Sequence, residues 1–247
     1  MDLYVDIGNS AVKWASGEAL EIGDIQAVSS KEIDTILIDR WQSLAVPGRV
    51  CLSSVLQESK LAWLKAWILR HWRIEPVMAV TRAQELGVTN GYREPTQLGV
   101  DRWLALLSAR SLSQGPVLVV DCGTATTIDA MDETGHHLGG VILPGLQLFR
   151  HCLTGNTDLP PLNESDVIDY FATDTATGIT SGAMLATVSS VERMTQMLQT
   201  KSQEKVSCLL TGGQAGSLSR QLSISHQFMP NLVLQGLALQ MAVNVRP

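Results

Sequence analysis

Two short motifs in this chain combine a carboxylate, a glycine and hydroxyl or amide side chains. The first is Asp6-x-Gly8-Asn9-Ser10 followed by Lys13, and the second is Asp121-x-Gly123-Thr124. Glycine lets an anion approach the backbone, and turn amides, hydroxyls and a lysine can donate to phosphate oxygens. Mg²⁺ prefers a few carboxylates together with phosphate oxygens and water. Both motifs are therefore candidate phosphate-binding turns, and the alternative for each alone is an ordinary β-hairpin with Asp-x-Gly turn chemistry.

The two motifs belong to longer near-repeats, at residues 3–10 and 118–125, in which an apolar run precedes the aspartate. Repetition of one supersecondary unit over about half a chain predicts a duplicated fold. A cleft between two such halves is a natural ligand site. Two opposed turns could hold a triphosphate and its metal, so the pair favours phosphate binding over the hairpin alternative.

Two further segments carry candidate site residues. Residues 90–102 form a polar loop that becomes a helix at Asp101 and Arg102. Asp101 could orient or accept the proton of an attacking hydroxyl, or it could simply cap the helix. Arg102 could pair with a substrate carboxylate in forked geometry. In Thr211-Gly212-Gly213 the glycines would let a flat ligand such as adenine lie on the backbone, and the alternative is a plain helix-start turn.

The elements that must position these residues alternate between strands and helices in both halves. Apolar periodicity predicts strands at residues 3–7, 11–15, 50–55, 77–80, 117–121, 127–131, 137–143 and 206–210. It predicts helices at residues 60–72, 101–112, 146–153, 176–198 and 232–243. Hairpins followed by strand–helix alternation, twice, predict an α/β duplication with subdomains at residues 1–114 and 115–247.

Composition excludes several classes of protein. The 247 residues are 45% hydrophobic and only 17% charged, which indicates a folded chain with a real core. The net charge is −6 and no basic block is present, so we expect no nucleic-acid partner. No uncharged apolar run reaches the ~18 residues of a membrane span. The first residues lack a signal-peptide pattern and the four cysteines fit no zinc or redox spacing, so we expect a cytoplasmic protein without a membrane partner.

The motifs resemble those of a known family. The two aspartate motifs and Thr211-Gly212-Gly213 are similar to the phosphate and adenosine motifs of the actin and sugar-kinase superfamily, and within it the whole chain resembles the type III pantothenate kinases. The most specific segments are Tyr92-x-x-Pro95-x-x-Leu98-Gly99-x-Asp101-Arg102 and Gly139-Gly140-x-Ile142-x-Pro144-Gly145, with Leu159-Pro160 downstream. The chain departs from the family pattern at Ser10, which replaces Thr, and at Asp174 and Gly178, which replace Asn and Ala.

The resemblance implies duplicated actin-like (ribonuclease H-like) subdomains with a cleft between them. It implies ATP-dependent phosphorylation of pantothenate to 4'-phosphopantothenate, the first step of coenzyme A biosynthesis. The implied cofactors are ATP as co-substrate, Mg²⁺ and a monovalent cation, K⁺ or NH₄⁺. Members are usually homodimers in which the second subunit completes the pantothenate pocket.

The resemblance also implies a role for each matching residue. Asp101 would be the catalytic base, Asp6 would place Mg²⁺ through water, and Asp121 would hold the monovalent cation. The ATP contacts implied by the resemblance are Asp6, Gly8, Asn9, Ser10, Lys13, Thr124, Gly212 and Gly213. The pantothenate contacts that it implies are Tyr92, Gly99, Val100, Asp101, Arg102 and Thr175, with Arg102 facing the substrate carboxylate.

Other functions on the same fold stay open at this point. One is a kinase for another small hydroxylated substrate, or a phosphatase acting on phosphate chains, and residues 92–102 argue against both. Another is a non-catalytic regulatory or accessory factor, as some relatives have been named. Intact Asp6, Asp101, Asp121 and Thr124 favour catalysis, and the lack of a basic face argues against direct DNA binding.

Overall fold

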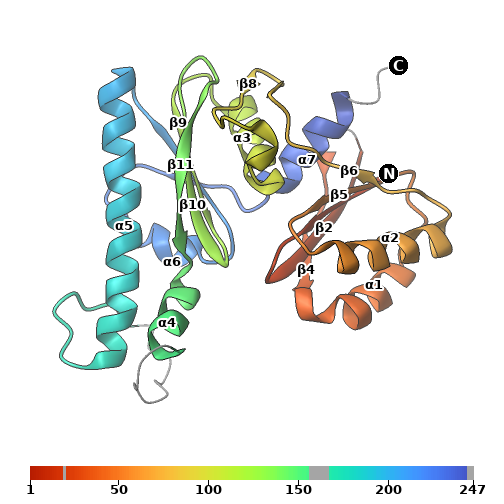
Figure 1. Cartoon of the computed structure of the whole chain (residues 1–247), viewed down its shortest axis with the longest axis horizontal. Helices are drawn as coiled ribbons and strands as arrows, with labels where there is room; N and C mark the ends of the chain where they lie inside the picture. Colours follow the sequence, from red (N-terminus) through yellow and green to blue (C-terminus); the bar gives the residue numbers. More distant parts are fainter. Residues whose placement is uncertain (19–20, 156–166, 244–247) are drawn as a thin grey trace. The chain divides into compact units, whose positions relative to one another are not determined.

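A computed structural model describes residues 1–18, 21–155 and 167–243, so the Leu159-Pro160 motif lies outside the described residues. The chain divides into two compact units. Unit 1 comprises Met1–Leu112 and Asn231–Pro247, and unit 2 comprises Ser113–Pro230. Figure 1 shows both units, each with its own sheet and helices.

The sheet of unit 1 is built around a β-hairpin. Its six strands are β1 (Asp2–Ile7), β2 (Ala11–Glu18), β3 (Glu21–Ile22), β4 (Gln26–Ser29), β5 (Val50–Ser54) and β6 (Val77–Met78). They run in the order β3-β2-β1-β5-β6, with β4 also paired to β2. Strand β1 is antiparallel to β2 and parallel to β5, so the turn after β1 lies at the end of a central strand.

Helices cover both faces of this sheet (Figure 1). Helices α1 (Ile38–Gln42) and α2 (Glu58–Trp72) pack on one face, where the fully buried Trp41 is the centre of an aromatic cluster. Its ring centroid lies 5.5 Å from that of Trp72, 6.1 Å from Trp67 and 6.3 Å from Trp14. Such pairs add to the energy of apolar burial and fix how the two helices pack on the strands.

Helices α3 (Val100–Leu112) and α7 (Leu232–Val243) pack against each other and against the other face. A Cβ at Gly236 would overlap the backbone of Leu104, so only glycine allows the two helices to approach this closely. The sequence expectation placed residues 115–247 in the second subdomain, and α7 corrects it. This helix is apolar on nearly every side and must be buried all round, and the partners that bury it belong to unit 1.

Unit 2 repeats the plan of unit 1. Its strands are β9 (Val117–Cys122), β10 (Ala125–Met131), β11 (His137–Pro144), β12 (Ser207–Thr211) and β13 (Gln227–Phe228), in the order β11-β10-β9-β12-β13. Strand β9 is antiparallel to β10 and parallel to β12, as β1 is to β2 and β5. The predicted α/β duplication is therefore confirmed.

Three helices complete unit 2: α4 (Leu146–Gly155), α5 (Thr175–Ser202) and α6 (Ala215–Ser219). The long helix α5 runs beside the sheet, as Figure 1 shows. It buries Met184, Val188 and Val191 against a core that includes Leu118 and Val120 of β9. Helix α6 begins just after Thr211-Gly212-Gly213.

The largest local difference from the sequence expectation lies between residues 15 and 50, where no element was predicted. The structure has strands β3 and β4, a 3₁₀ turn η1 (Ser30–Glu32), a π-helical turn η2 (Ile33–Leu37) and helix α1. These elements are only two to five residues long, too short for a periodic apolar pattern to emerge. The remaining short elements are strands β7 (Gln84–Glu85) and β8 (Val88–Thr89) and the 3₁₀ turn η3 (Pro95–Gln97).

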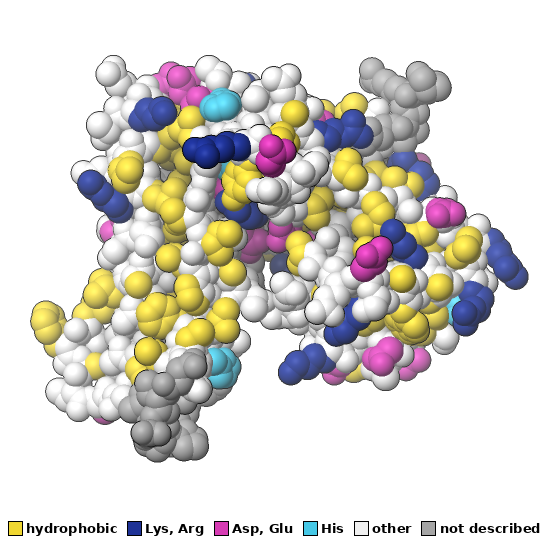
Figure 2. Space-filling model, in the orientation of Figure 1, with side chains coloured by type: hydrophobic (Ala, Val, Ile, Leu, Met, Phe, Trp, Pro, Cys, Tyr) yellow, Lys and Arg dark blue, Asp and Glu magenta, His cyan; other side chains and the backbone are white. Residues whose placement is uncertain are grey.

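Two surface properties bear on function. Within the described ranges, no helix combines the length and the apolar character needed to cross a bilayer. On the face drawn in Figure 2, Lys and Arg side chains are scattered and alternate with Asp and Glu.

Candidate active site

The first phosphate motif forms a tight turn between β1 and β2. The Gly8 amide donates to the Ala11 carbonyl at 3.0 Å and closes the turn. In the antiparallel pair Asp6 lies opposite Lys13, so both side chains project from the same face of the hairpin. Asp6 and Lys13 are half-buried, whereas Asn9 at the tip is exposed. The hairpin thus presents a carboxylate, an ammonium group and turn amides together.

Ser30, which the sequence did not single out, holds this turn in place. Its hydroxyl donates to the Gly8 carbonyl at 2.7 Å, and its amide donates to the Ser10 carbonyl at 3.0 Å. The side chain is buried at the start of η1. A serine this far along the chain, in a segment without a recognisable pattern, gives no sequence signal of its role.

The second phosphate motif forms the corresponding turn between β9 and β10. The Gly123 amide donates to the Ala125 carbonyl at 3.0 Å. Asp121 lies opposite Thr127, where the first turn has Lys13 opposite Asp6. The second turn therefore has a hydroxyl where the first has an ammonium group.

The Thr211-Gly212-Gly213 segment packs directly on this second turn. Gly212 has a φ of +92°, and a Cβ there would overlap the Asp121 carboxylate and lie 2.5 Å from the Cys122 carbonyl oxygen. The amide of Gln214 donates to the same carbonyl at 3.0 Å. The structure thus brings Asp121, Thr124 and Gly212 into one constellation within unit 2.

Cys122 lies within this constellation, and its thiol is inert. Burial, and then the neighbouring Asp121 carboxylate and Cys208, raise the pKa of the Cys122 thiol to about 12. The thiol is neutral at any working pH and offers no thiolate for nucleophilic chemistry or metal binding.

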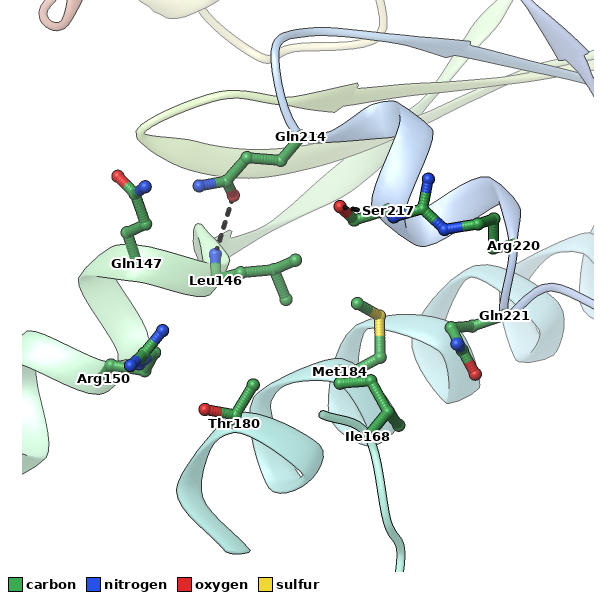
Figure 3. Close-up of a pocket in the computed structure, with 10 residues that line it drawn as sticks. All are labelled: Leu146, Gln147, Arg150, Ile168, Thr180, Met184, Gln214, Ser217, Arg220 and Gln221. Atoms are coloured by element: carbon green, nitrogen blue, oxygen red, sulfur yellow. Dashed lines mark hydrogen bonds between the residues drawn. The ribbon is translucent and has the colours of Figure 1, made fainter. Parts of the chain in front are cut away.

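Gln214, whose amide binds the Cys122 carbonyl, also lines a pocket of about 360 Å³, shown in Figure 3. The pocket is lined by α4, α5, α6 and their flanks, and the side-chain oxygen of Gln214 accepts a hydrogen bond from the Leu146 amide at 3.0 Å on its wall. Sequence reasoning missed this pocket because its lining comes from separate segments without a shared motif. The lining residues are Leu146, Gln147, Arg150, Ile168, Thr180, Met184, Gln214, Ser217, Arg220 and Gln221.

In unit 1, Asp101 lies in the first turn of α3, where its Oδ1 accepts a hydrogen bond from the Arg102 amide at 2.8 Å. Asp101 thus lies inside the helix and is not its N-cap residue, and the hydrogen bond from the neighbouring amide fixes the orientation of the carboxylate. The Trp103 amide donates to the Gly99 carbonyl at 3.0 Å, so Gly99 lies directly at the start of the helix.

Gly99 supplies the space that this carboxylate needs, because a Cβ at residue 99 would lie 2.6 Å from Asp101 Oδ1. We expect Gly99→Ala to displace the carboxylate and to lower kcat about 100-fold, the loss that a misplacement of about 1 Å can cause. Steady-state kinetics and thermal unfolding measure the two effects. The control is Gly48→Ala, where a Cβ would make only ordinary contacts; a Gly99→Ala enzyme as active as this control would contradict the account.

Arg102 and Tyr92 meet across the loop. The Arg102 side chain is only 8% exposed, its Nη1 donates to the Tyr92 hydroxyl at 2.7 Å, and its guanidinium carbon lies 5.6 Å from the centroid of the Tyr92 ring. A guanidinium has five N–H donors in a rigid fork. Held in this way, Arg102 is suited to bind a carboxylate close to Asp101.

Thr175 is the first residue of α5 and lies in unit 2. The preceding Asp174 caps this helix, its Oδ1 accepting from the Thr177 amide at 2.9 Å. Hydrogen bonds from the backbone amide and the side chain of Thr177 lower the pKa of Asp174 below its usual range. The replacement of the family's Asn by Asp174 therefore keeps the cap, and Thr175 stays exposed beside it.

The donors available for cations are oxygens. Among the residues that the structure describes, no three His, Cys, Asp or Glu side chains gather to form a metal site. Asp6 and Asp121 each lie beside a tight turn with backbone oxygens instead. One carboxylate completed by phosphate and water oxygens suits Mg²⁺, and a carboxylate with backbone carbonyls suits a weakly bound monovalent cation. The donor sets fit both ions.

Two sheets of one topology, each with an Asp-x-Gly turn after its central strand, define the fold of the actin and sugar-kinase superfamily. A solved structure of a proposed 2-dehydro-3-deoxygalactonokinase from Sinorhizobium meliloti matches with a TM-score of 0.60 at 14% identity, covering 100% of both chains. A proposed Baf family transcriptional activator from Campylobacter jejuni matches with a TM-score of 0.61 at 20% identity, covering 98% of this chain and 100% of that one. At these identities the likeness is one of fold.

Sequence comparison identifies the family. The family described as type III pantothenate kinase matches residues 2–197. A type III pantothenate kinase of Nitrosospira multiformis is 37% identical over 236 residues, which are 95% of this chain and 88% of the relative. The chain belongs to the type III pantothenate kinase family.

Proposed function

We propose that this chain phosphorylates pantothenate with the residues described above, Asp101 and Arg102 acting on the acceptor. The reaction is ATP-dependent phosphorylation of pantothenate to 4'-phosphopantothenate, the first step of coenzyme A biosynthesis. The observation that carries the assignment of residues is that Arg102 donates to the Tyr92 hydroxyl with its guanidinium and to the Asp101 carboxylate with its backbone amide. No feature of the described residues favours the regulatory alternative.

On the acceptor side, we assign Arg102 to the carboxylate of pantothenate and Tyr92 to holding the guanidinium. Gly99 and Val100 would form the backbone wall of this site. Asp101 would then orient the primary hydroxyl towards the γ-phosphorus and accept its proton. Since phosphoryl transfer passes through a loose transition state, the proton can leave late, and Asp101 need not be a strong base.

On the ATP side, we assign the phosphates to the turn amides of Gly8, Asn9 and Ser10 and to Lys13, and a further phosphate contact to Thr124. Asp6 would hold Mg²⁺ through water, and Mg²⁺ when bound neutralises phosphate charge. Asp121 would hold K⁺ or NH₄⁺. We assign the adenosine to Gly212, Gly213 and the neighbouring pocket, whose 360 Å³ is within the range of small-ligand sites.

We further propose that the enzyme works in the cytoplasm as a homodimer in which Thr175 contributes to pantothenate binding. Exposed apolar side chains in unit 2, Phe171 above all at 92% exposure, support an interface there.

A coupled assay of ATP consumption tests the function. We expect turnover that depends on pantothenate, and a several-fold fall when K⁺ is exchanged for Na⁺. Turnover that is unaffected by the exchange would remove the cation role of Asp121 and keep the kinase. No pantothenate-dependent turnover in either salt would contradict the proposed function.

A further inference from the structure

Two buried side-chain amides, on Gln240 and Asn90, bind residues 80–85. This segment precedes the loop at residues 92–102 that we assigned to pantothenate. Gln240 is fully buried in α7 and Asn90 is 7% exposed. We propose that both are positioning residues for the Tyr92–Arg102 site, a role that rests on the proposed function. Asn90 begins the polar segment at residues 90–102, but no sequence motif assigns it a role of its own. Gln240 belongs to no motif and lies beyond the residues 2–197 that match the family.

Gln240 binds one residue of the segment at both of its backbone groups. Its side-chain oxygen accepts from the Val80 amide at 3.1 Å, and its Nε2 donates to the Val80 carbonyl at 2.9 Å. These two hydrogen bonds resemble those that a residue of a neighbouring β-strand would make. The same Nε2 also donates to Oε2 of Glu85 at 2.5 Å. The amide is thus used at its oxygen and twice at its nitrogen, which fixes its orientation.

Glu85 passes this constraint on to α3. Its side chain is only 7% exposed, its Oε1 lies 3.4 Å from Arg82 Nε, and its Oε2 accepts from the indole N–H of Trp103 at 3.4 Å. Trp103 directly follows Arg102 in the first turn of α3. One buried carboxylate therefore links α7, the segment at residues 80–85 and the helix that carries Asp101 and Arg102.

Asn90 makes the next link, from the segment to Tyr92. Its backbone amide donates to the Ala83 carbonyl at 2.8 Å, and its Nδ2 donates to the carbonyls of Arg82 at 3.2 Å and Pro95 at 3.1 Å. Its Oδ1 accepts from the Tyr92 amide at 3.0 Å. At the far end of the loop, the Thr81 hydroxyl donates to the Leu98 carbonyl at 3.0 Å. The loop is therefore held from its base on both sides.

These contacts form a continuous path from Gln240 through Asn90 and Tyr92 to the Arg102 guanidinium. Removing one member of a buried polar network leaves its partners without hydrogen bonds, and the structure shifts to satisfy them. Gln240→Leu roughly keeps the volume and removes the amide, so Val80 loses both of its hydrogen bonds to this side chain and Glu85 loses one of its partners. We expect KM for pantothenate to rise about 10-fold, since small misplacements at a site have large effects, while KM for ATP stays within about two-fold.

The experiment compares the full-length Gln240→Leu enzyme with Gln235→Leu as matched control. Gln235 lies on the same helix, and its side-chain oxygen accepts a hydrogen bond from the Ser108 hydroxyl of α3 at 3.3 Å. Its replacement therefore disturbs the α7–α3 contact and leaves the Gln240 hydrogen bonds to Val80 and Glu85 in place. Both variants are measured by steady-state kinetics in each substrate and by hydrogen exchange of backbone amides. We expect faster exchange at Val80 and Tyr92 in Gln240→Leu alone.

Asn90→Ala supplies a second variant, without a buried charge, if Gln240→Leu does not fold. Alanine removes the acceptor for the Tyr92 amide and the donors to the carbonyls of Arg82 and Pro95, so we again expect a rise in KM for pantothenate. Equal rises in both KM values, or the same changes in Gln235→Leu, would overturn the positioning role. Unchanged hydrogen exchange at Val80 and Tyr92 would also overturn the positioning role. This measurement does not need turnover, so it separates a failure of the positioning role from a failure of the proposed function.

Discussion

Asp101→Asn should lower kcat by about 10²–10⁴-fold, the contribution typical of a positioned acid or base. The asparagine oxygen can still accept the Arg102 amide hydrogen, as Oδ1 of Asp101 does at 2.8 Å, so the start of α3 keeps this hydrogen bond. What the variant loses is the negative charge that orients the acceptor hydroxyl and takes its proton. KM for ATP should stay within about two-fold, because the residues assigned to ATP are unchanged.

The matched control is Asp174→Asn, the same change at another helix start, where Oδ1 accepts the Thr177 amide hydrogen at 2.9 Å. We expect this control to keep most of its turnover. Steady-state kinetics in both substrates, with thermal unfolding to verify folding, measures the difference. An Asp101→Asn enzyme with turnover similar to that of the control would remove Asp101 from the mechanism.

Arg102→Met should raise KM for pantothenate at least about 30-fold. Truncating one partner of a buried, hydrogen-bonded charge pair costs about 2–5 kcal/mol, and 1.4 kcal/mol corresponds to a factor of ten. The side chain is 8% exposed and already held by the Tyr92 hydroxyl, so little water is available to replace the guanidinium. KM for pantothenate in Arg102→Lys should fall between the values for the unmodified enzyme and Arg102→Met, because lysine keeps the charge and lacks the forked guanidinium.

The ligand itself provides the sharpest control for this prediction. The alcohol analogue of pantothenate lacks the carboxylate, so the unmodified enzyme should discriminate strongly against it and Arg102→Met should not. Arg93→Met, at an exposed arginine of the same loop, should leave both KM values unchanged. If Arg102→Met still prefers pantothenate to the alcohol as strongly as the unmodified enzyme does, Arg102 does not face the carboxylate.

Where the sequence carried long periodic runs, it predicted the elements well. The second-half strands at residues 117–121 and 137–143 lie within β9 and β11, and the helix at residues 232–243 coincides with α7. Periodicity reports only that a helix is buried, however. It does not say against what, and so it could not place α7 beside α3.

The candidate site shows the same division. Asp6 and Lys13 could be paired from the sequence because they flank one turn of a hairpin, and Arg102 and Tyr92 because a known family motif contains both. Ser30, Gln214 and Gln240 could not be found in this way. Each acts through hydrogen bonds to the backbone of distant residues, and such contacts constrain one side chain without leaving a pattern around it.

The identity of the product tests the central claim most directly. Phosphorus NMR of a reaction with the unmodified chain, ATP, Mg²⁺, K⁺ and pantothenate should show one phosphomonoester on the primary hydroxyl of pantothenate for each ADP formed. The same reaction with the Asp101→Asn variant should show neither the phosphomonoester nor the ADP signal. ADP and inorganic phosphate without a pantothenate ester, or no consumption of ATP at all, would contradict the account.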